Sequence, residues 1–334
     1  MKSKEFYIIE GECTMKLVMV ERDSVGLDVN VDGYKDFGEV TYYPHTTLEE
    51  GVEHIGDAEV VISNKLPLNE TTLKDCPNVK LICNTATGFD NIDLDYCNKR
   101  GIRVTNVKDY STAAVAQHTF ALLFYVLEKL RGYDDYVKSG EYAKSGKFSY
   151  FGYEFTELEG RTWGIVGMGN IGRKVAKIAE AFGCRVIFYS SSGNSTCTEY
   201  ERVDFDTLLK ESDFLSLHCP LTDRTRDLMN KEAFSKMKKE AILINVARGP
   251  VVNQEALYEA LSEGMIAGAG LDVLTKEPMT EDNPLAKIKD SHKLLITPHM
   301  AWGSVEARQR VVDGVYKNIE AYLNGEKRNV VNEV

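Results

Sequence analysis

The feature that most constrains the fold is a glycine-rich turn between a short apolar run and a helical pattern. Residues 162–172 read TWGIVGMGNIG, and apolar residues recur at helical spacing in the RKVAKIAEAFGC that follows. A strand, a glycine turn and a helix in this order are typical of a dinucleotide-binding unit. Gly167 would form the tight turn, Gly169 would let the backbone approach a pyrophosphate, and Gly172 would let the helix pack closely on the strand. The alternative is a glycine-rich turn that holds no ligand.

The start of the predicted helix adds a means of holding phosphates. The N–H groups in the first turn of a helix have no acceptor within that helix, and the positive end of the helix dipole lies there. The helix would begin near Asn170 and Ile171. We therefore expect this turn to bind the pyrophosphate of a dinucleotide.

Strand-like and helix-like segments alternate along the chain on both sides of this turn. This alternation predicts mostly parallel sheets with helices on both faces, and ligands bind such sheets beyond the carboxyl ends of the strands. The strand-like runs, besides TWGIVG, are KLVMVE, EVTYYP, AEVVISNK, VKLICNTATG, IRVTNV, RVIFYS, FLSLHC, AILINVA, GAGLDVL and KLLITPH.

Two long helical patterns stand out. Residues 111–133 form the longest, and they are so apolar that the helix must be buried, either in its own domain or against a second subunit. His118 lies on it, and we expect a hydrogen-bonded packing residue there rather than a catalytic one. The polar and aromatic stretch 134–160 could form an arm over a partner subunit, and residues 301–325 read as a closing helix.

The composition excludes several classes of protein. The chain has 334 residues with 43% hydrophobic and 27% charged residues, which suits a soluble protein of two domains. The net charge of −11 argues against a nucleic-acid partner, because phosphate binding requires a basic face. No apolar run reaches the roughly 18 residues of a membrane span, and no secretion signal is recognisable. The seven cysteines are scattered without a CxxC, which predicts reduced thiols in the cytoplasm and no zinc site.

The first residues have a separate interpretation. Met15 opens the first strand-like run, and Glu10-Gly11-Glu12 can be encoded by a purine-rich stretch that resembles a ribosome-binding site. We therefore expect Met15 to be the natural start and residues 1–14 to be an artefact of gene prediction.

Three polar residues follow successive strand-like runs in the second half of the chain. Arg248 follows AILINVA, Glu277 follows GLDVL, and His299 follows KLLIT. In a parallel sheet all three can face one cleft with the nucleotide. Taken singly, each has a plainer interpretation: a turn cap, a solvated loop residue and a turn histidine.

These residue types suit hydride transfer to a carbonyl carbon. Histidine can protonate the carbonyl oxygen near neutral pH. A carboxylate bonded to an imidazole orients the ring and favours its protonated form. Arginine can hold a substrate carboxylate with two parallel bonds and polarise the adjacent carbonyl. Arg248, Glu277 and His299 beside a dinucleotide therefore predict interconversion of a 2-keto acid and a 2-hydroxy acid.

The chain resembles the D-isomer-specific 2-hydroxyacid dehydrogenase family over nearly its whole length from Met15. The resemblance implies a Rossmann cofactor domain, residues 111–301, inserted into a split flavodoxin-like substrate domain, residues 1–110 and 302–334. It also implies a homodimer. The matching segments are NTATGFDNID, NVKDYSTAAVAQHTFALL, GRTWGIVGMGNIGRKVA, HCPLTDRTRDLMN, LINVARGPVVNQEAL, GAGLDVLTKEP and TPHMAWGSVEARQR.

The resemblance also implies roles for individual residues. Arg248 would anchor the substrate, Glu277 would pair with the histidine, and His299 would be the acid and base. Backbone N–H groups near Thr87 and Gly88 would receive the substrate carboxylate. The other positions implied are Lys65 near the substrate, Val246 and Asp272 near the nicotinamide carboxamide, and Cys219, Pro220 and Thr225 along the adenine side of the cofactor.

Three features resemble the glycerate dehydrogenase, or hydroxypyruvate reductase, branch of the family. They are SNK with Lys65, the segment ATGFDN, and HMAW with Trp302. A bulky indole beside His299 would favour a small substrate such as hydroxypyruvate or glyoxylate, although Trp302 could instead pack the final helix. The alternatives are another branch, acting on phosphoglycerate, branched-chain or aryl keto acids, or a dinucleotide-sensing interaction protein.

The end of RVIFYS bears on the choice between NAD and NADP. An acidic residue there would bond the ribose 2′-OH of NAD. This chain has Ser190 and Ser191 instead, and no arginine or lysine lies between Tyr189 and Tyr200 to bind a 2′-phosphate. Serine hydroxyls can bond either group. We therefore expect NAD, with NADP left open.

Overall fold

The computed structural model describes residues 15–334 in two compact units. The first contains the described residues up to Tyr110 together with Gly303–Val334, and the second is Ser111–Trp302. Trp302, which the predicted domain boundary assigned to the substrate domain, thus belongs to the second unit. The hypothesis about residues 1–14 lies outside the described residues.

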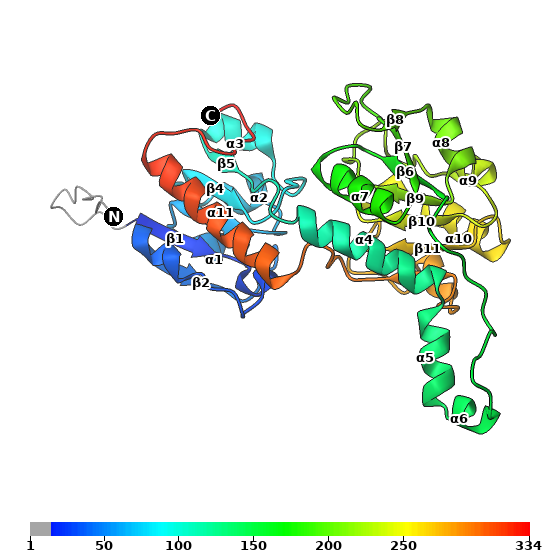
Figure 1. The fold of residues 1–334 in the computed structure, drawn as a ribbon. Helices are drawn as coiled ribbons and strands as arrows, with labels where there is room; N and C mark the ends of the chain where they lie inside the picture. Colours follow the sequence, from blue (N-terminus) through cyan, green and yellow to red (C-terminus); the bar gives the residue numbers. More distant parts are fainter. Residues whose placement is uncertain (1–14) are drawn as a thin grey trace, which may run out of the picture. The chain divides into compact units, whose positions relative to one another are not determined.

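The first unit is built on a parallel sheet with the strand order β2-β1-β3-β4-β5 (Figure 1). This is the doubly wound order of flavodoxin-like folds. Its strands are β1 (Met15–Met19), β2 (Gly38–Tyr42), β3 (Val60–Ser63), β4 (Leu81–Asn84) and β5 (Arg103–Thr105). Its shorter helices are α1 (Gly51–Ile55), α2 (Glu70–Leu73) and α3 (Leu94–Arg100), with 3-10 turns η1 (Arg22–Val25) and η2 (Asp32–Phe37).

The closing helix α11 (Val305–Leu323) belongs to this first unit, although it begins 200 positions after the end of β5 at Thr105. Asn318 Nδ2 donates to Asn106 O at 2.8 Å, and a Cβ at Gly314 would stand 2.5 Å from Val107 Cγ1. Its buried apolar residues recur every four positions: Ala307, Val311, Val315 and Ile319. Full burial of such an aliphatic side chain contributes about 1.5–3 kcal/mol, so this apolar stripe fixes the helix on the first unit.

The second unit has a parallel sheet in the order β12-β11-β10-β9-β6-β7-β8. Read from β8, this is the Rossmann order with one further strand. The strands are β6 (Thr162–Val166), β7 (Arg185–Tyr189), β8 (Glu201–Arg202), β9 (Phe214–Leu217), β10 (Ile242–Asn245), β11 (Gly268–Leu271) and β12 (Leu294–Ile296). The predicted class, two parallel-sheet α/β domains, is confirmed.

Helices cover both faces of this second sheet, and each face has its own apolar core. One core joins the sheet to α4 and α7, and the other joins it to α8, α9 and α10. These helices are α4 (Thr112–Leu127), α7 (Asn170–Ala181), α8 (Phe205–Glu211), α9 (Lys231–Lys236) and α10 (Gln254–Ser262), with 3-10 turns η3 (Gly249–Val251) and η4 (Pro284–Lys287).

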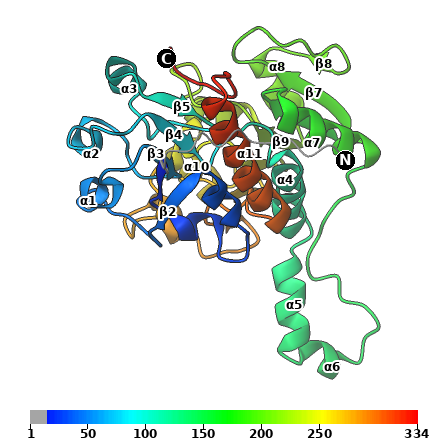
Figure 2. The same ribbon diagram turned by 90° about the vertical axis from the view of Figure 1, so that its left-hand side faces the viewer.

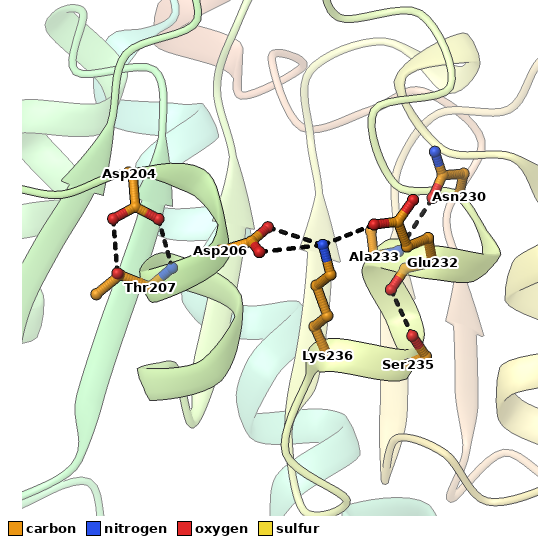
Figure 3. A network of polar contacts seen from close by, with 8 residues as sticks. All are labelled: Asp204, Asp206, Thr207, Asn230, Glu232, Ala233, Ser235 and Lys236. Carbon is orange, nitrogen blue, oxygen red and sulfur yellow. Dashed lines mark hydrogen bonds and ion pairs between the residues drawn. The ribbon is translucent and has the colours of Figure 1, made fainter.

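Polar contacts hold α8 against α9 at the surface (Figure 3). Asp204 and Asn230 cap the two helices by accepting from Thr207 N at 2.9 Å and Ala233 N at 3.0 Å. Lys236 on α9 donates to Asp206 Oδ1 on α8 at 2.9 Å. The caps satisfy N–H groups that have no acceptor within the helix, whereas the exposed ion pair of Lys236 is screened by water. The caps therefore fix where these helices begin.

The prediction of one continuous helix over residues 111–133 is wrong, because the structure divides this stretch into two helices. The chain breaks after α4, where Lys129 has a left-handed φ of 55°, and resumes as α5 (Leu130–Lys138). Lys129 Nζ donates to His292 O at 2.9 Å, and a Cβ at Gly132 would stand 2.4 Å from His292 Nε2. Contacts with a distant segment thus override the local helical pattern. The apolar side chains of α4 are buried within the second unit itself.

Helix α5 and the segment after it form an arm that extends away from the sheet of the second unit (Figures 1 and 2). It contains α6 (Glu141–Ser145) and a stretch without regular structure. Phe148 and Phe151 on it are 96% and 88% exposed. Within residues 15–334, no helix combines the length and the apolar character needed to cross a membrane.

Candidate active site

The glycine turn packs directly on the neighbouring strand ends. Gly167 has a φ of 95°, which favours glycine, and a Cβ there would stand 2.8 Å from Cys219 N after β9. Gly167 N also donates to Tyr189 O at the end of β7 at 3.0 Å. A Cβ at Gly172 would stand 2.3 Å from Gly167 O. Any side chain at Gly167 or Gly172 would therefore push the turn out of the sheet edge.

The turn leaves room where a dinucleotide would approach. Gly169 is the N-cap of α7, and because it has no side chain it does not cap the helix through a side-chain bond. A Cβ at this position would meet no atom within 4 Å. Asn170, Ile171 and Gly172 form the first turn of this helix, whose N–H groups have no acceptor inside the helix. Free space at Gly169 beside the positive end of the helix dipole fits a pyrophosphate.

The loop after β9 carries Cys219, Pro220 and Thr225, which the resemblance places along the adenine side of the cofactor. Burial raises the pKa of Cys219 to about 11, so its thiol stays protonated and uncharged. Thr225 is fully buried and its hydroxyl donates to Pro220 O at 2.7 Å. The structure therefore gives Thr225 a part in shaping the loop that presents Pro220.

Glu277 and His299 are in contact although they lie 22 positions apart in the sequence. Glu277 Oε2 lies 2.6 Å from His299 Nδ1, and Glu277 Oε1 accepts from Leu274 N at 2.8 Å. The carboxylate is thus anchored by the loop after β11 while it bonds the imidazole in the loop after β12. Nδ1 is thus the nitrogen bonded to the carboxylate, and Nε2 is the other nitrogen of the ring.

Arg248 lies in the loop after β10, and that loop packs on the loop of Glu277. A Cβ at Gly249 would stand 2.0 Å from Leu274 O, so only glycine permits this backbone contact. Buried Asn245 donates through Nδ2 to Arg248 O at 3.0 Å, and Arg248 Nη1 donates to Ala247 O at 2.9 Å. The three predicted residues therefore come from loops that lie side by side at the carboxyl ends of β10, β11 and β12.

Asp272 holds the loop that carries His299. Its side chain is 2% exposed and accepts from Thr297 Oγ1 at 2.6 Å, Met300 N at 2.9 Å and Ala301 N at 2.8 Å. His299 N in turn donates to Asp272 O at 2.8 Å, and His299 has a left-handed φ of 55°. Asp272, which the resemblance predicts to be a cofactor residue, thus stabilises an unusual backbone conformation at His299. Val246, the other residue predicted near the nicotinamide, is partly buried after β10.

His118 on α4 joins the hydrogen bonds between Thr297 and Asp272. Its Nε2 lies 2.9 Å from Thr297 Oγ1, whose single hydrogen is already donated to Asp272. His118 Nε2 must therefore carry the proton and donate it. Burial lowers the pKa of His118 against the opposing effect of Asp272, which favours this neutral form. The histidine has the hydrogen-bonded packing position expected from the sequence.

The other predicted substrate residues lie in the first unit, except for Trp302. Lys65 is exposed after β3, and its N–H donates to Glu21 Oε2 at 2.8 Å. Thr87 and Gly88 follow β4, where Thr87 Oγ1 donates to Val107 O at 2.9 Å and Asn84 Nδ2 to Gly88 O at 2.6 Å. Trp302 is partly buried in the second unit, next to the loop that Asp272 holds.

Sequence reasoning missed Glu21, whose carboxylate is buried in the first unit. Its Oε2 accepts from Ser63 Oγ at 2.9 Å and from the successive N–H groups of Asn64, Lys65 and Leu66 at 2.8, 2.8 and 3.0 Å. It therefore shapes the Lys65 loop. Its position at the end of KLVMVE, at the carboxyl edge of a predicted strand, was the signal that could have identified it.

The described residues hold no cluster of three or more His, Cys, Asp or Glu side chains suited to a metal ion. This sheet edge carries the start of α7, the imidazole with its carboxylate, and the guanidinium.

The chain is similar to known proteins over most of its length. Residues 120–301 match the model of the D-isomer specific 2-hydroxyacid dehydrogenase NAD binding domain. Glycerate dehydrogenase of Methylorubrum extorquens is 39% identical, over 95% of this chain and 99% of that protein. Hydroxypyruvate reductase of Blautia hydrogenotrophica is 37% identical, over 92% of this chain and 96% of that protein.

The fold is also similar to that of solved structures. D-lactate dehydrogenase of Aquifex aeolicus, complexed with NAD and lactic acid, has a TM-score of 0.83 at 31% identity, covering 96% of this chain and 99% of that one. The nicotinamide dinucleotide predicted from the glycine turn is confirmed as the cofactor class. The chain therefore belongs to the D-isomer-specific 2-hydroxyacid dehydrogenase family.

Proposed function

We propose that this protein reduces a small 2-keto acid, hydroxypyruvate or glyoxylate, to the D-2-hydroxy acid with a reduced nicotinamide dinucleotide. The observation that carries the proposal is the 2.6 Å contact between Glu277 Oε2 and His299 Nδ1, at the sheet edge that also bears the glycine turn. Relatives named hydroxypyruvate reductase, glycerate dehydrogenase and glyoxylate reductase support the substrate class.

His299, Glu277 and Arg248 have different roles in the proposed reaction. A reduced nicotinamide, when bound, supplies the hydride. His299 donates its Nε2 proton to the carbonyl oxygen, while Glu277 stabilises the imidazolium before transfer and orients the ring. Arg248 binds the substrate carboxylate through parallel N–H bonds and polarises the neighbouring carbonyl. In the reverse direction His299 accepts the hydroxyl proton.

We propose that the first unit, considered by itself, offers groups that can bind a carboxylate. None of the hydrogen bonds among the described residues uses the N–H of Thr87 or Gly88. Two such groups can receive one carboxylate. Lys65 would add a positive charge in that unit. In the second unit, the indole of Trp302, close to His299 in the sequence, would limit the size of the substrate.

A panel of keto acids tests the proposed function. Hydroxypyruvate, glyoxylate, phosphohydroxypyruvate, 2-ketoisocaproate and phenylpyruvate are each incubated with NADH and with NADPH, and the loss of absorbance at the nicotinamide band is followed. We expect the highest kcat/KM with hydroxypyruvate or glyoxylate. A preference for a larger acid would point to another branch of the family. No turnover with any acid, together with retained dinucleotide binding, would contradict the enzymatic function.

Replacing Glu277 with glutamine should lower kcat for keto-acid reduction about tenfold. The amide can still accept from Leu274 N, so the loop is retained, but the charge-assisted bond to His299 Nδ1 is replaced by a neutral one. Charge-assisted hydrogen bonds are roughly twice as strong as neutral ones, so the ring that donates the proton is held less firmly. Steady-state kinetics measure this. Glu281→Gln, at an exposed site in the same loop, is the control, and an unchanged kcat in Glu277→Gln would contradict the pairing.

We further propose that the protein is a cytoplasmic homodimer. With α4 buried in its own unit, the arm supplies the exposed apolar surface: Phe148 at 96% and Phe151 at 88% exposure. Tyr142 and Phe155 on the same segment are also exposed, and exposed apolar side chains gathered on one segment are typical of an interaction surface. Light scattering gives the mass in solution, and the mass of one chain would contradict the dimer.

A further inference from the structure

The turn after β7 lies where the ribose of a dinucleotide would approach the sheet. Tyr189 O, at the end of β7, accepts from Gly167 N of the glycine turn at 3.0 Å. The chain then turns back, since Gly193 N donates to Ser190 O at 3.1 Å. The turn carries serine hydroxyls at positions 190–192 and no carboxylate. It therefore offers hydrogen-bond donors and no negative charge that would repel a phosphate.

An arginine from the next strand lies against this turn. Arg202 Nη1 donates to Gly193 O at 2.9 Å, and a Cβ at Gly193 would stand 3.8 Å from Arg202 Nη2. The residue reaches the turn because β8 pairs with β7 in parallel, with Phe188 opposite Arg202. The guanidinium is thus already fixed at the serine turn by a backbone acceptor.

The charge of Arg202 is not neutralised by the acidic residues around it. Its neighbour Glu201 pairs with Arg185 at 2.7 Å, and Glu199 lies 3.4 Å from Arg173. No ion pair among residues 15–334 includes Arg202. A guanidinium with remaining N–H donors and no carboxylate partner is suited to a phosphate.

A second arginine holds the far side of the same loop. Arg173, in the first turn of α7, donates through Nη2 to Thr196 Oγ1 at 3.3 Å. The loop is therefore tied both to the helix that begins at the glycine turn and to β8. Because Glu199 faces Arg173, this arginine positions the loop and Arg202 supplies the unbalanced positive charge.

We propose that Arg202 and the serine hydroxyls at positions 190–192 bind the 2′-phosphate of NADP(H), so that the protein uses NADPH as well as NADH. The inference rests on the proposed function, because it concerns the cofactor of the same reaction. Arginine forms paired N–H bonds with phosphate oxygens, and the absence of an acidic residue at the end of β7 removes the repulsion that selects NAD. NADH remains a ligand because the serine hydroxyls can bond a ribose 2′-OH.

Binding at equilibrium tests the assignment without relying on turnover. Isothermal titration gives the Kd of NADPH and of NADH for the whole protein, for Arg202→Gln and for Arg202→Lys. Arg131→Gln is the matched control, because Arg131 is an exposed arginine on α5. We expect Arg202→Gln to raise the Kd of NADPH about tenfold or more and to leave that of NADH within about twofold, since only the phosphate contact is lost. Arg202→Lys, which keeps the charge, should have a smaller effect.

The outcomes separate this inference from the proposed function. If the wild-type protein binds NADH but not NADPH, or if Arg202→Gln weakens both dinucleotides equally, the role of Arg202 is refuted while the reductase remains. If neither dinucleotide binds, the proposed function fails as well. A selective loss of NADPH binding that Arg131→Gln does not reproduce supports the assignment.

Discussion

Replacing His299 with alanine is expected to lower kcat for keto-acid reduction by about 10²–10⁴-fold, the usual contribution of a general acid. The proton that the carbonyl oxygen needs would then have to come from water. Glu277 Oε2 would also lose the imidazole that lies 2.6 Å away. The measurement is steady-state turnover of hydroxypyruvate, together with the Kd of NADH, which should change little because the glycine turn is untouched.

The backbone at His299 calls for a second variant. Its φ of 55° is left-handed, and alanine pays a steric penalty there that asparagine largely avoids. His299→Asn should therefore fold with the loop in place and still lack a group that transfers a proton at neutral pH. His45→Ala, at an exposed histidine of the first unit, is the control. Near-normal turnover in His299→Asn would contradict the proposed mechanism.

Replacing Arg248 with lysine is expected to raise the KM for the keto acid about 10- to 100-fold, since charge-assisted hydrogen bonds contribute about 1.5–3 kcal/mol each. Lysine keeps the positive charge but cannot reproduce the two parallel bonds of a guanidinium. The backbone contacts of Asn245 with Arg248 O and Ala247 N do not depend on the side chain, so the loop should persist.

Two comparisons make this prediction specific to substrate binding. Arg328→Lys, at an exposed arginine of the first unit, should leave KM unchanged. The Kd of NADH should also stay within about twofold in Arg248→Lys, because no phosphate contact is altered. A KM close to that of the wild-type protein would show that Arg248 does not bind the substrate carboxylate.

Local sequence was enough to predict the main strands of both sheets and the residues at their carboxyl ends. Strand-like runs end shortly before Arg248, Glu277 and His299, and the structure places β10, β11 and β12 in adjacent positions. This worked because parallel strands bring their carboxyl ends to one edge of the sheet. Whether a segment forms a strand or a helix depends largely on residues within that segment, so hydrophobic periodicity can predict it.

Three features could not be found in this way. Strand β8 has two exposed, charged residues, Glu201 and Arg202, and no hydrophobic pattern at all. The break at Lys129 depends on His292, far along the chain. The role of Asp272 depends on N–H groups of the loop after β12. In each instance the deciding contact joins residues that are distant in sequence.

The sequence by itself determined the family, the parallel α/β class, the glycine turn and the identity of the three candidate catalytic residues. The tertiary structure alone decided how those residues are held. Asp272 stabilises the left-handed backbone at His299, Gly249 lets two loops touch, and β8 brings Arg202 to the serine turn. The physical reason is that hydrophobic periodicity and short motifs reflect hydrogen bonds and packing within one segment of the chain. Hydrogen bonds between separate loops exist only after the sheet has aligned the strand ends.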